Sequence, residues 1–370
     1  MIDVTTLTDG GQDPLEVARR IEAFLGRARE SLDLALYDVR LPSPVAEVVR
    51  GAITGAAERG VAVRLAYNVD SPSPIAVPPP PRTDPGLLES LDLPTRRIPG
   101  EPDLMHHKFV VRDRASVWTG STNWTVDSWT REENVVVVVD SPAIAGAYAR
   151  DFEELWTTQD VARSGKEAPQ RVEVDGATVR AWFCPGQGDE LSHRIARAIG
   201  RARRVRIASP VITSGPILGT LAQVASDGQA DLAGVVDATQ IGEVVRQWEA
   251  NGNVAWKLPA LSTIVERPAF TGKRSTPYRP GSVHDYMHAK VTVADATVFV
   301  GSFNLSHSGE MNAENMLEIE SPPLADRLAA YIDSVRARYP PVELNRIPPA
   351  GSGAAARTAR SGLRPAPRAG

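Results

Sequence analysis

The chain has 370 residues, with 41 Lys and Arg against 45 Asp and Glu, which gives a formal net charge of −4. At about 150 residues per domain, this length indicates two or three domains, each large enough to bury a core of its own. The mild acidity provides no general attraction to nucleic acid or to anionic lipid. Any polyanion would therefore have to be held by a local cluster of basic residues.

The sequence excludes several classes of protein. No stretch approaches the roughly 18 apolar residues of a membrane-spanning helix, so we expect no integral membrane insertion. The N-terminal residues lack the charged and apolar regions of a secretory signal. The single cysteine, Cys184, excludes an intrachain disulfide and any multi-cysteine zinc or iron–sulfur site. We therefore expect a cytoplasmic protein.

Segment 1–160 alternates between helical and strand patterns. Proline or a capping Asp or Ser opens each predicted helix. Helices are predicted at 14–29, 44–59 and 142–156, and strands at 32–37, 61–67, 109–111, 117–119 and 135–139. The proline-rich segment 71–86 interrupts the pattern and is predicted to be an extended surface loop, either beside a cleft or simply connecting elements. The alternation indicates an α/β layered domain.

The second half repeats this plan after a polar segment, 157–172, that marks the predicted domain boundary. Helices are predicted at 190–202, 241–250 and 322–339, and strands at 205–208, 232–236, 290–293, 298–300 and 316–319. Residues 341–370 are rich in Pro, Gly, Ala and Arg and are predicted to be disordered. We therefore expect one domain at 1–160, a second at 173–340 and a tail at 341–370.

A motif of unusual composition occurs once in each half. His106 and Lys108 are followed by Asp113, and the same spacing recurs at His288, Lys290 and Asp295. A Gly-Ser-x-Asn segment and a Glu-Asn pair follow each motif, with one position deleted in the second copy. The matched pairs are Gly120 and Gly301, Ser121 and Ser302, Asn123 and Asn304, Glu133 and Glu314, and Asn134 and Asn315. The two halves are therefore predicted to be duplicated domains.

The paired His-x-Lys-x4-Asp and Gly-Ser-x-Asn motifs resemble the signature of the phospholipase D superfamily. The first copy, at 105–109 and 119–125, is similar to the mitochondrial cardiolipin hydrolase and nuclease branch. The resemblance implies two tandem phospholipase D-like domains, each a mixed sheet flanked by helices and related by a pseudo-twofold, with the active site between them. It also implies phosphodiester hydrolysis through a covalent phosphohistidine, without a cofactor. A monomer is expected, because one chain carries both motifs.

The two motif histidines are expected to have different roles in the reaction. A neutral imidazole can attack phosphorus near pH 7, while a second imidazole protonates the leaving alkoxide and then deprotonates water. The resemblance implies that His106 is the nucleophile and His288 the general acid/base. The near-equivalence of the two repeats leaves the reverse assignment open.

The other motif residues are expected to support the histidines and the phosphate. Lys108 and Lys290 follow their histidines by two residues, so in a strand both side chains share a face and can neutralise phosphate oxygens. Amide donors and supporting hydroxyls at the same oxygens are predicted at Asn123, Asn304, Ser121 and Ser302. Acceptors that orient the histidine rings are predicted at Glu133 and Glu314. Structural bracing of the catalytic motifs is predicted for Asp113 and Asp295.

The lysines and amides can supply the charge stabilisation often given to a metal, so we predict a metal-independent enzyme with no metal site. His284 and His288 have the i, i+4 spacing of a helical metal pair, but no third ligand is evident.

Three further groups of residues are weaker candidates for the site. Tryptophans that pack in the core or line the cleft are Trp118, Trp124 and Trp129. Strand-end candidates are Tyr67, Asn68, Asp70, Asp237 and Thr239. A basic lip, or else a solvated loop, is predicted at Lys273, Arg274 and Arg279.

The substrate class stays open between two activities. A phospholipase D acting on phosphatidyl lipids fits the duplicated chain and its acidic balance, and we favour it. A metal-independent endonuclease for single-stranded nucleic acid fits the Glu-Asn pairs, the first-copy similarity and the arginine-rich tail. A non-catalytic scaffold is disfavoured because both motifs are intact. The sequence does not separate hydrolysis from transfer to an alcohol.

Overall fold

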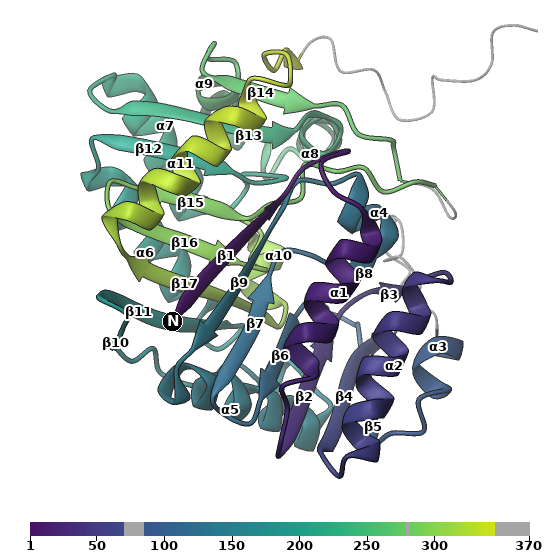
Figure 1. Cartoon of the computed structure of the whole chain (residues 1–370). Helices are drawn as coiled ribbons and strands as arrows, with labels where there is room; N and C mark the ends of the chain where they lie inside the picture. Colours follow the sequence, from purple (N-terminus) through teal and green to yellow (C-terminus); the bar gives the residue numbers. More distant parts are fainter. Residues whose placement is uncertain (70–84, 279–281, 345–370) are drawn as a thin grey trace, which may run out of the picture.

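The computed structural model describes residues 1–69, 85–278 and 282–344 of the chain. They form two large mixed sheets, one from each half, with helices on the sheet faces (Figure 1). The predicted fold class, an α/β protein of two tandem domains with mixed sheets, is therefore confirmed. Of the predicted proline-rich loop, residues 71–84 lie outside the described residues, and Pro85 begins a short helix.

The first sheet has seven strands in the order β1-β9-β7-β6-β2-β4-β5. Its strands are β1 (Ile2–Leu7), β2 (Ser31–Leu36), β4 (Ala62–Val69), β5 (Thr95–Pro99), β6 (Lys108–Arg112), β7 (Ser116–Gly120) and β9 (Asn134–Asp140). The pairs β2–β4 and β4–β5 are parallel, and the other pairs are antiparallel. A separate two-stranded ribbon joins β3 (Val39–Arg40) to β8 (Trp124–Thr125). The helices of this half are α1 (Pro14–Leu25), α2 (Val45–Glu58), α3 (Pro85–Glu89), α4 (Val126–Thr130) and α5 (Pro142–Thr158).

Predicted capping residues begin two of the longer helices of this half. The Asp13 carboxylate accepts a hydrogen bond from the Leu15 backbone amide at 2.7 Å, and Pro14 occupies the first turn of α1. Ser141 caps α5 in the same way, again followed by proline. These local signals fix where each helix leaves the sheet, and therefore which face it covers.

The second sheet has eight strands in the order β10-β11-β17-β16-β15-β12-β13-β14. Its strands are β10 (Val172–Val174), β11 (Ala177–Cys184), β12 (Arg204–Ala208), β13 (Asp231–Asp237), β14 (Phe270–Lys273), β15 (Val291–Ala294), β16 (Thr297–Gly301) and β17 (Glu314–Glu320). Its helices are α6 (Gly188–Arg201), α7 (Gly215–Asp227), α8 (Ala238–Ala250), α9 (Leu258–Val265), α10 (His307–Met311) and α11 (Pro322–Arg336). Apart from β10, the strand order repeats that of the first sheet, as expected of a duplication.

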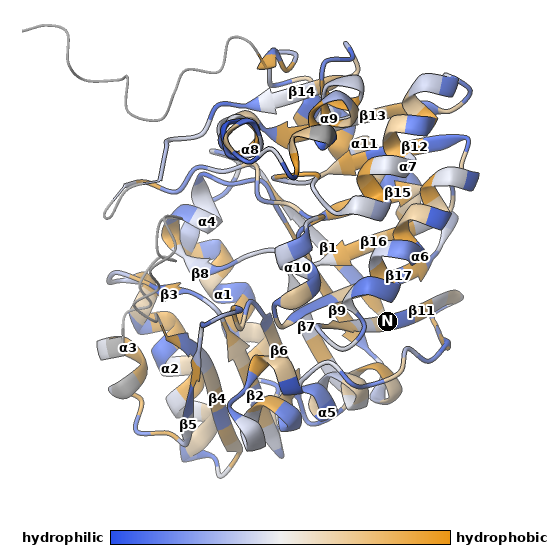
Figure 2. Cartoon of the chain, turned by 180° about the vertical axis from the view of Figure 1, so that it is seen from behind, coloured by the Kyte–Doolittle hydropathy of each residue, from blue (hydrophilic) through white to orange (hydrophobic). Residues whose placement is uncertain are grey.

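Three hydrophobic cores hold these layers together. One core lies between the first sheet and helices α1 to α3, and another between the second sheet and helices α6 to α9. The third core contains residues of both sheets together with α5 and α11. In β6, Phe109 and Val111 enter this shared core, while Val110 enters the outer one. Figure 2 shows hydrophobic residues concentrated along the strands of both sheets. The two halves therefore share a continuous apolar layer.

Some elements were not predicted from the sequence. In the edge strand β1 the buried residues are Val4 and Leu7, three apart, so the alternation of a half-buried strand is missing. Helix α7 contains Gly215 and Gly219, which weaken helix propensity, yet its buried side packs against α6. Tertiary packing rather than local pattern stabilises both elements. The predicted start of the tail at residue 341 is also wrong, because Val342 is buried in the core. Residues 345–370 lie outside the described residues.

Replacing Gly120 by Ala should destabilise the protein. At Gly120 φ is +147°, and a Cβ atom would lie 2.1 Å from the Val135 carbonyl oxygen. We expect the free energy of unfolding, measured by urea denaturation, to fall by about 1–3 kcal/mol. The control is Gly51→Ala in α2, where a Cβ meets open space and stability should stay equal or rise. Equal stability of Gly120→Ala and the parent would contradict the steric clash expected at this position.

Candidate active site

The two motif histidines lie just before equivalent strands of the two sheets, and each is attached to the opposite half of the chain. The His106 backbone amide donates to the Ala313 carbonyl at 2.9 Å, and the His288 amide donates to the Glu133 carbonyl at 3.2 Å. Met105 and Met287, which precede the histidines, form isolated parallel bridges to the same two residues. Both histidines are buried. The site is therefore assembled from two loops exchanged across the interface between the halves.

Glu314 holds the ring of His106. The Nδ1 atom of His106 lies 2.7 Å from Oε1 of Glu314, at the start of β17 in the other half. Burial raises the pKa of Glu314 to about 8, while Lys108, Ser302, Lys290 and Asn312 oppose that shift. Glu314 thus lies where it can orient the ring of His106, which is the role predicted for it.

Glu133 does not have the predicted role at His288. The Nδ1 atom of His288 lies 3.1 Å from Oδ1 of Asn134 and 3.3 Å from Oε2 of Glu132. The Glu133 carboxylate instead contacts the ammonium of Lys273 at 3.0 Å and accepts from the Tyr339 hydroxyl. The sequence alignment of the two halves failed here because the loop before β9 is one residue longer than the loop before β17.

The two lysines fold back onto their own histidines. Lys108 Nζ donates to the His106 carbonyl at 2.5 Å, and Lys290 Nζ donates to the His288 carbonyl at 2.7 Å. Burial lowers the pKa of Lys108 to about 7, against the opposing effect of Glu314, Asp38 and Glu132. Burial and the neighbouring Lys108 also lower the pKa of Lys290. Both lysines therefore lose their protons more readily than an exposed lysine does.

The same forces keep the histidines neutral. Burial, followed by the charges of Lys108 and Lys290, lowers the pKa of His106 well below its ordinary value. Burial and the same two lysines lower the pKa of His288. Each lysine therefore acts electrostatically on both histidines, which places the four side chains in one cluster. A neutral imidazole keeps one ring nitrogen able to attack or to accept a proton.

The predicted asparagines carry polar atoms that the rest of the protein does not use. Among the described residues, Oδ1 of Asn123 and Oδ1 of Asn304 are buried without a hydrogen-bond partner. Each follows by two residues a serine that touches the acceptors of the histidines. Ser121 Oγ donates to Asn134 Oδ1 at 2.7 Å, and a side-chain hydrogen bond from Ser302 acts on Glu314. Unsatisfied buried amides at this place suit a polar ligand.

The aspartates of the motifs bind backbone amides at the opposite ends of their strands. Asp113 accepts from the amides of Arg29, Glu30 and Ser31, at 2.7 to 3.1 Å. Asp295 accepts from the amides of Arg203 and Arg204. Both residues have positive φ, +54° and +52°, in the turn that follows their strand. These contacts anchor the adjacent strands β2 and β12, so the aspartates are placed to brace the motifs rather than to touch a substrate.

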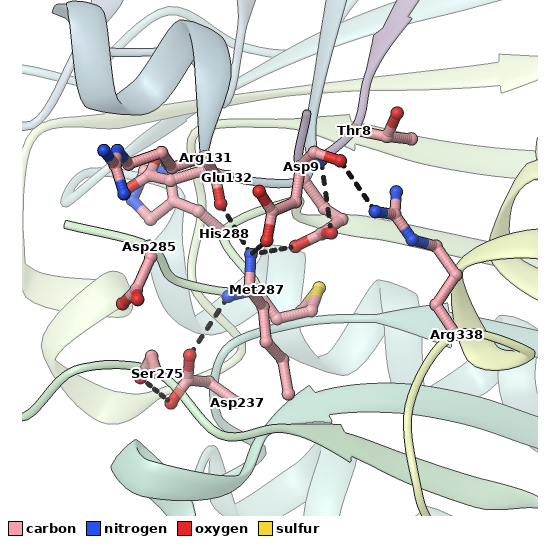
Figure 3. Close-up of polar contacts among 12 residues, drawn as sticks. Thr8, Asp9, Arg131, Glu132, Asp237, Ser275, Asp285, Met287, His288 and Arg338 are labelled. Carbon is pink, nitrogen blue, oxygen red and sulfur yellow. Dashed lines mark hydrogen bonds and ion pairs between the residues drawn. The ribbon is translucent and has the colours of Figure 1, made fainter. Parts of the chain in front are cut away.

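Two strand-end residues, considered only as weak candidates, hold the loops that carry the histidines. Asn68 Oδ1 accepts from the Met105 amide at 3.0 Å, and Asp237 Oδ2 accepts from the Met287 amide at the same distance. Figure 3 shows Asp237 between Met287 and Ser275, whose hydroxyl donates to Asp237 at 2.7 Å. Burial raises the pKa of Asp237 to about 6. The signal available in the sequence was the matched position of the two residues at the ends of β4 and β13.

The predicted basic lip is wrong for Lys273. This residue is buried, and its ammonium lies 3.1 Å from Asp9 and 3.0 Å from Glu133. Arg274 is exposed, and Arg279 lies outside the described residues. The three tryptophans Trp118, Trp124 and Trp129 are buried in the core of the first half, which supports packing over a place in the cleft. Tyr37 was not predicted; its ring meets the His106 ring edge-on, with centroids 4.5 Å apart.

Metal and membrane features complete the description of the site. Within residues 1–69, 85–278 and 282–344, no group of three or more His, Cys, Asp or Glu side chains is arranged to hold a metal ion. Nδ1 of His284 contacts the guanidinium of Arg40 at 3.2 Å, so a cation already occupies the place where a metal would bind this ring. None of the helices in the described part of the chain has both the length and the apolar character needed to span a bilayer.

A family model described as "Cardiolipin synthase, PLD-like domain" matches residues 21–156 and again 191–336. The chain belongs to the phospholipase D superfamily. The mitochondrial cardiolipin hydrolase of Xenopus tropicalis is 33% identical over 147 residues, which cover 39% of this chain and 62% of that protein. The human protein of the same name is 28% identical over 144 residues, covering 38% of this chain and 50% of that protein. The matched region is thus less than two thirds of these relatives, and the resemblance seen in the sequence is confirmed.

A solved structure supports the superfamily fold over most of the chain. The phosphatidylserine synthase of Haemophilus influenzae Rd KW20 aligns with a TM-score of 0.63 at 14% identity, covering 92% of this chain and 87% of that one. At this identity the likeness concerns the fold alone.

Binding of a tetrahedral anion should be coupled to proton uptake. Because the pKa of Lys108 is about 7, most of this lysine is uncharged at pH 8, and an adjacent dianion will raise its pKa. Tungstate titrated calorimetrically at pH 8, in buffers of different ionisation enthalpy, should show net proton uptake by the complex. Lys108→Met should reduce that uptake. Binding enthalpies that are the same in all buffers would contradict the predicted coupling.

Proposed function

We propose that the chain hydrolyses phosphodiester bonds of phospholipids through a covalent phosphohistidine. The observation that carries the proposal is that His106 and His288 are both buried and each contacts a side chain of the opposite half, while Lys108 and Lys290 bond to the carbonyls of these histidines. Each Nδ1 contacts a side-chain acceptor, which leaves Nε2 of each ring for chemistry. His106 is the nucleophile and His288 the general acid/base.

The first step transfers the phosphoryl group to the enzyme. The lone pair of His106 Nε2 attacks phosphorus, the ester P–O bond breaks, and the leaving oxygen takes the bonding pair. His288, which takes up a proton when the anionic phosphodiester binds beside it, gives its Nε2 proton to that oxygen and becomes neutral. The phosphorylated ring of His106 carries a positive charge, which the Glu314 carboxylate stabilises across the 2.7 Å contact with Nδ1.

The second step releases the phosphoryl group to water. Neutral His288 accepts a proton from the water molecule, whose oxygen attacks phosphorus. The P–N bond breaks and its electron pair returns to His106 Nε2, so both histidines recover their starting states. Lys108, Lys290 and the amides of Asn123 and Asn304 stabilise the charge that develops on the phosphate oxygens in both steps. An alcohol in place of water would give transfer instead of hydrolysis.

Phospholipid is the substrate class that the relatives favour. The proteins that match this chain at 33% and 31% identity are named mitochondrial cardiolipin hydrolases. The net charge of −4 also disfavours attraction of a long polyanion, whereas a single phosphodiester needs only the local lysines.

Single-stranded nucleic acid is a second candidate, and an aromatic cluster near His288 favours it. The ring of His284 lies 5.9 Å from that of Tyr278 and 5.3 Å from that of Tyr286, centroid to centroid. Arg40 contacts His284 from the other half. Aromatic rings beside an arginine are the usual platform for stacking unpaired bases.

An activated substrate should separate the two histidines. Bis(p-nitrophenyl) phosphate has a leaving group that needs no protonation, so His288→Asn should release a single equivalent of p-nitrophenolate and then stop. His106→Asn should release none, because no phosphohistidine can form. Stopped-flow absorbance and mass spectrometry after an alkaline quench would measure the burst and locate the phosphate.

The control for this experiment is His193→Asn, an exposed residue of α6, which should behave as the parent. The reverse pattern, a burst in His106→Asn alone, would assign the nucleophile to His288. Full turnover in either active-site variant would overturn the two-histidine mechanism.

A substrate panel in EDTA tests the substrate class and the metal requirement. We offer vesicles of cardiolipin or phosphatidylcholine, and labelled single-stranded DNA and RNA, with His106→Asn as the control for contaminating activity. We expect phosphatidic acid to be released in EDTA, because two lysines supply the charge stabilisation. Strand cleavage with inert vesicles would support the second candidate. Activity that appears only with an added divalent ion would contradict metal independence.

A further inference from the structure

The strand pairing shows how the two halves correspond around the histidines. Gly120 pairs with Val136 in the first sheet, and Gly301 pairs with Met316 in the second. The residue after each glycine shows the same correspondence. The Ser121 amide donates to the Val135 carbonyl, and the Ser302 amide donates to the Asn315 carbonyl, both at 2.9 Å. The strand pairing therefore matches Asn134 of β9 to Glu314 of β17. The motif spacing in the sequence matches Asn134 to Asn315 instead, one position later.

With this correspondence, an amide and a carboxylate have exchanged places between the halves. Asn134 occupies the position of Glu314, and each contacts Nδ1 of the histidine from the opposite half. Glu132 occupies the position of Asn312. Each of these two residues forms a side-chain hydrogen bond with the residue that contacts the histidine. Asn134 Nδ2 donates to Glu132 Oε2 at 3.0 Å, and Asn312 acts on Glu314. Both histidines thus have one carboxylate and one amide, in opposite order.

The contacts of Asn134 fix its amide and the tautomer of His288. Its Nδ2 donates to the Ser128 carbonyl at 3.0 Å as well as to Glu132, and its Oδ1 accepts from Ser121. The oxygen must therefore be the atom that faces His288, so Nδ1 of His288 donates and Nε2 carries the lone pair. A base with a free Nε2 is what the second step requires.

Glu132 places a carboxyl group against this ring. Its Oε2 lies 3.3 Å from His288 Nδ1 and accepts from the Ser128 hydroxyl, and the side chain is buried. Burial raises the pKa of Glu132, while its hydrogen bonds and the charges of Lys290 and Lys273 oppose that shift. The adjacent Glu133 is engaged elsewhere, with Lys273 and Tyr339.

We propose that Glu132 is the positioning residue that stabilises the protonated form of His288, with Asn134 as the relay that orients the ring. The pair Glu132 and Asn134 is the exchanged equivalent of Asn312 and Glu314. The inference rests on the proposed phosphohistidine mechanism and specifies how its general acid/base is supported. It also makes the two histidines unequal: the ring that carries the covalent phosphate contacts its carboxylate directly at 2.7 Å, whereas the proton-transferring ring contacts an amide at 3.1 Å and a carboxylate at 3.3 Å.

The first test removes the charge of each carboxylate separately. In Glu132→Gln, the burst from bis(p-nitrophenyl) phosphate should persist, while the steady rate after the burst falls about 100-fold, because His288 assists only water attack on this substrate. In Glu314→Gln the burst itself should slow. Glu153→Gln in α5 is the control, and its steady rate should stay within about threefold of the parent, because this exposed carboxylate pairs with Arg64 and has no contact with either histidine. Thermal denaturation checks that each variant is folded.

The second test exchanges the two side chains. Glu132→Asn combined with Asn134→Glu reproduces the order found at residues 312 and 314. The double variant should recover at least about tenfold of the steady rate lost in Glu132→Asn alone, because the carboxylate placed at position 134 would then contact His288 as Glu314 contacts His106. A residue needed only for folding would not be rescued by moving its charge two positions along the strand.

The outcomes separate this inference from the proposed function. A parent protein with no burst and no turnover on any phosphodiester would overturn the proposed function and this inference together. A parent that turns over normally while Glu132→Gln keeps its steady rate, or while Glu153→Gln loses as much, would overturn the role of Glu132 alone. An exchange variant no faster than Glu132→Asn would overturn the equivalence of the two pairs.

Discussion

The site depends on the way each half of the chain holds the histidine of the other. His106 is fixed by a backbone bond to Ala313 and a side-chain contact to Glu314, and His288 by a backbone bond to Glu133 and a contact to Asn134. Neither ring would be oriented by its own half alone. The apolar layer shared by both sheets, α5 and α11 therefore has a chemical consequence, because it sets the register in which the two loops exchange their contacts.

The electrostatics of the site follow from burying four basic side chains together. Burial penalises every charge, which lowers the pKa values of the histidines and lysines and raises those of Glu132 and Glu314. The resting cluster therefore carries less charge than its composition suggests. In the proposed mechanism, the negative charge of a bound phosphodiester would favour the protonated forms of the lysines, so that binding and activation are coupled. A metal ion placed in the same position would compete with Lys108 and Lys290 for the phosphate oxygens.

Much of the fold and the site could be predicted from the sequence, because the signals were local. The motif spacing identified both histidines and both lysines, and Pro14 and Pro142 marked helix starts that the structure contains. The partner of His288 could not be predicted in this way. One extra residue before β9 shifts the register, and only the strand pairing shows that Asn134 corresponds to Glu314. Lys273 looked exposed in sequence because its partners, Asp9 and Glu133, come from the other half.

Duplication gave the two halves the same motif but different surroundings. Next to His106 lies His107, whose Nδ1 accepts from the Asn315 amide and whose Nε2 is 3.0 Å from the buried Asp151. The Asn315 oxygen in turn accepts from Thr119 and Tyr148, so polar contacts cross the interface directly behind His106, the proposed nucleophile. At the equivalent positions behind His288 stand Ala289 and Val135, which pack in the apolar core. A ring that must receive phosphorus in one fixed orientation benefits from a rigid, hydrogen-bonded support. In the proposed mechanism the other ring only passes protons and needs its tautomer fixed, which Asn134 does with the support of Ser121, Ser128 and Glu132. The proposed division of labour between two identical motifs therefore follows from the different residues around them.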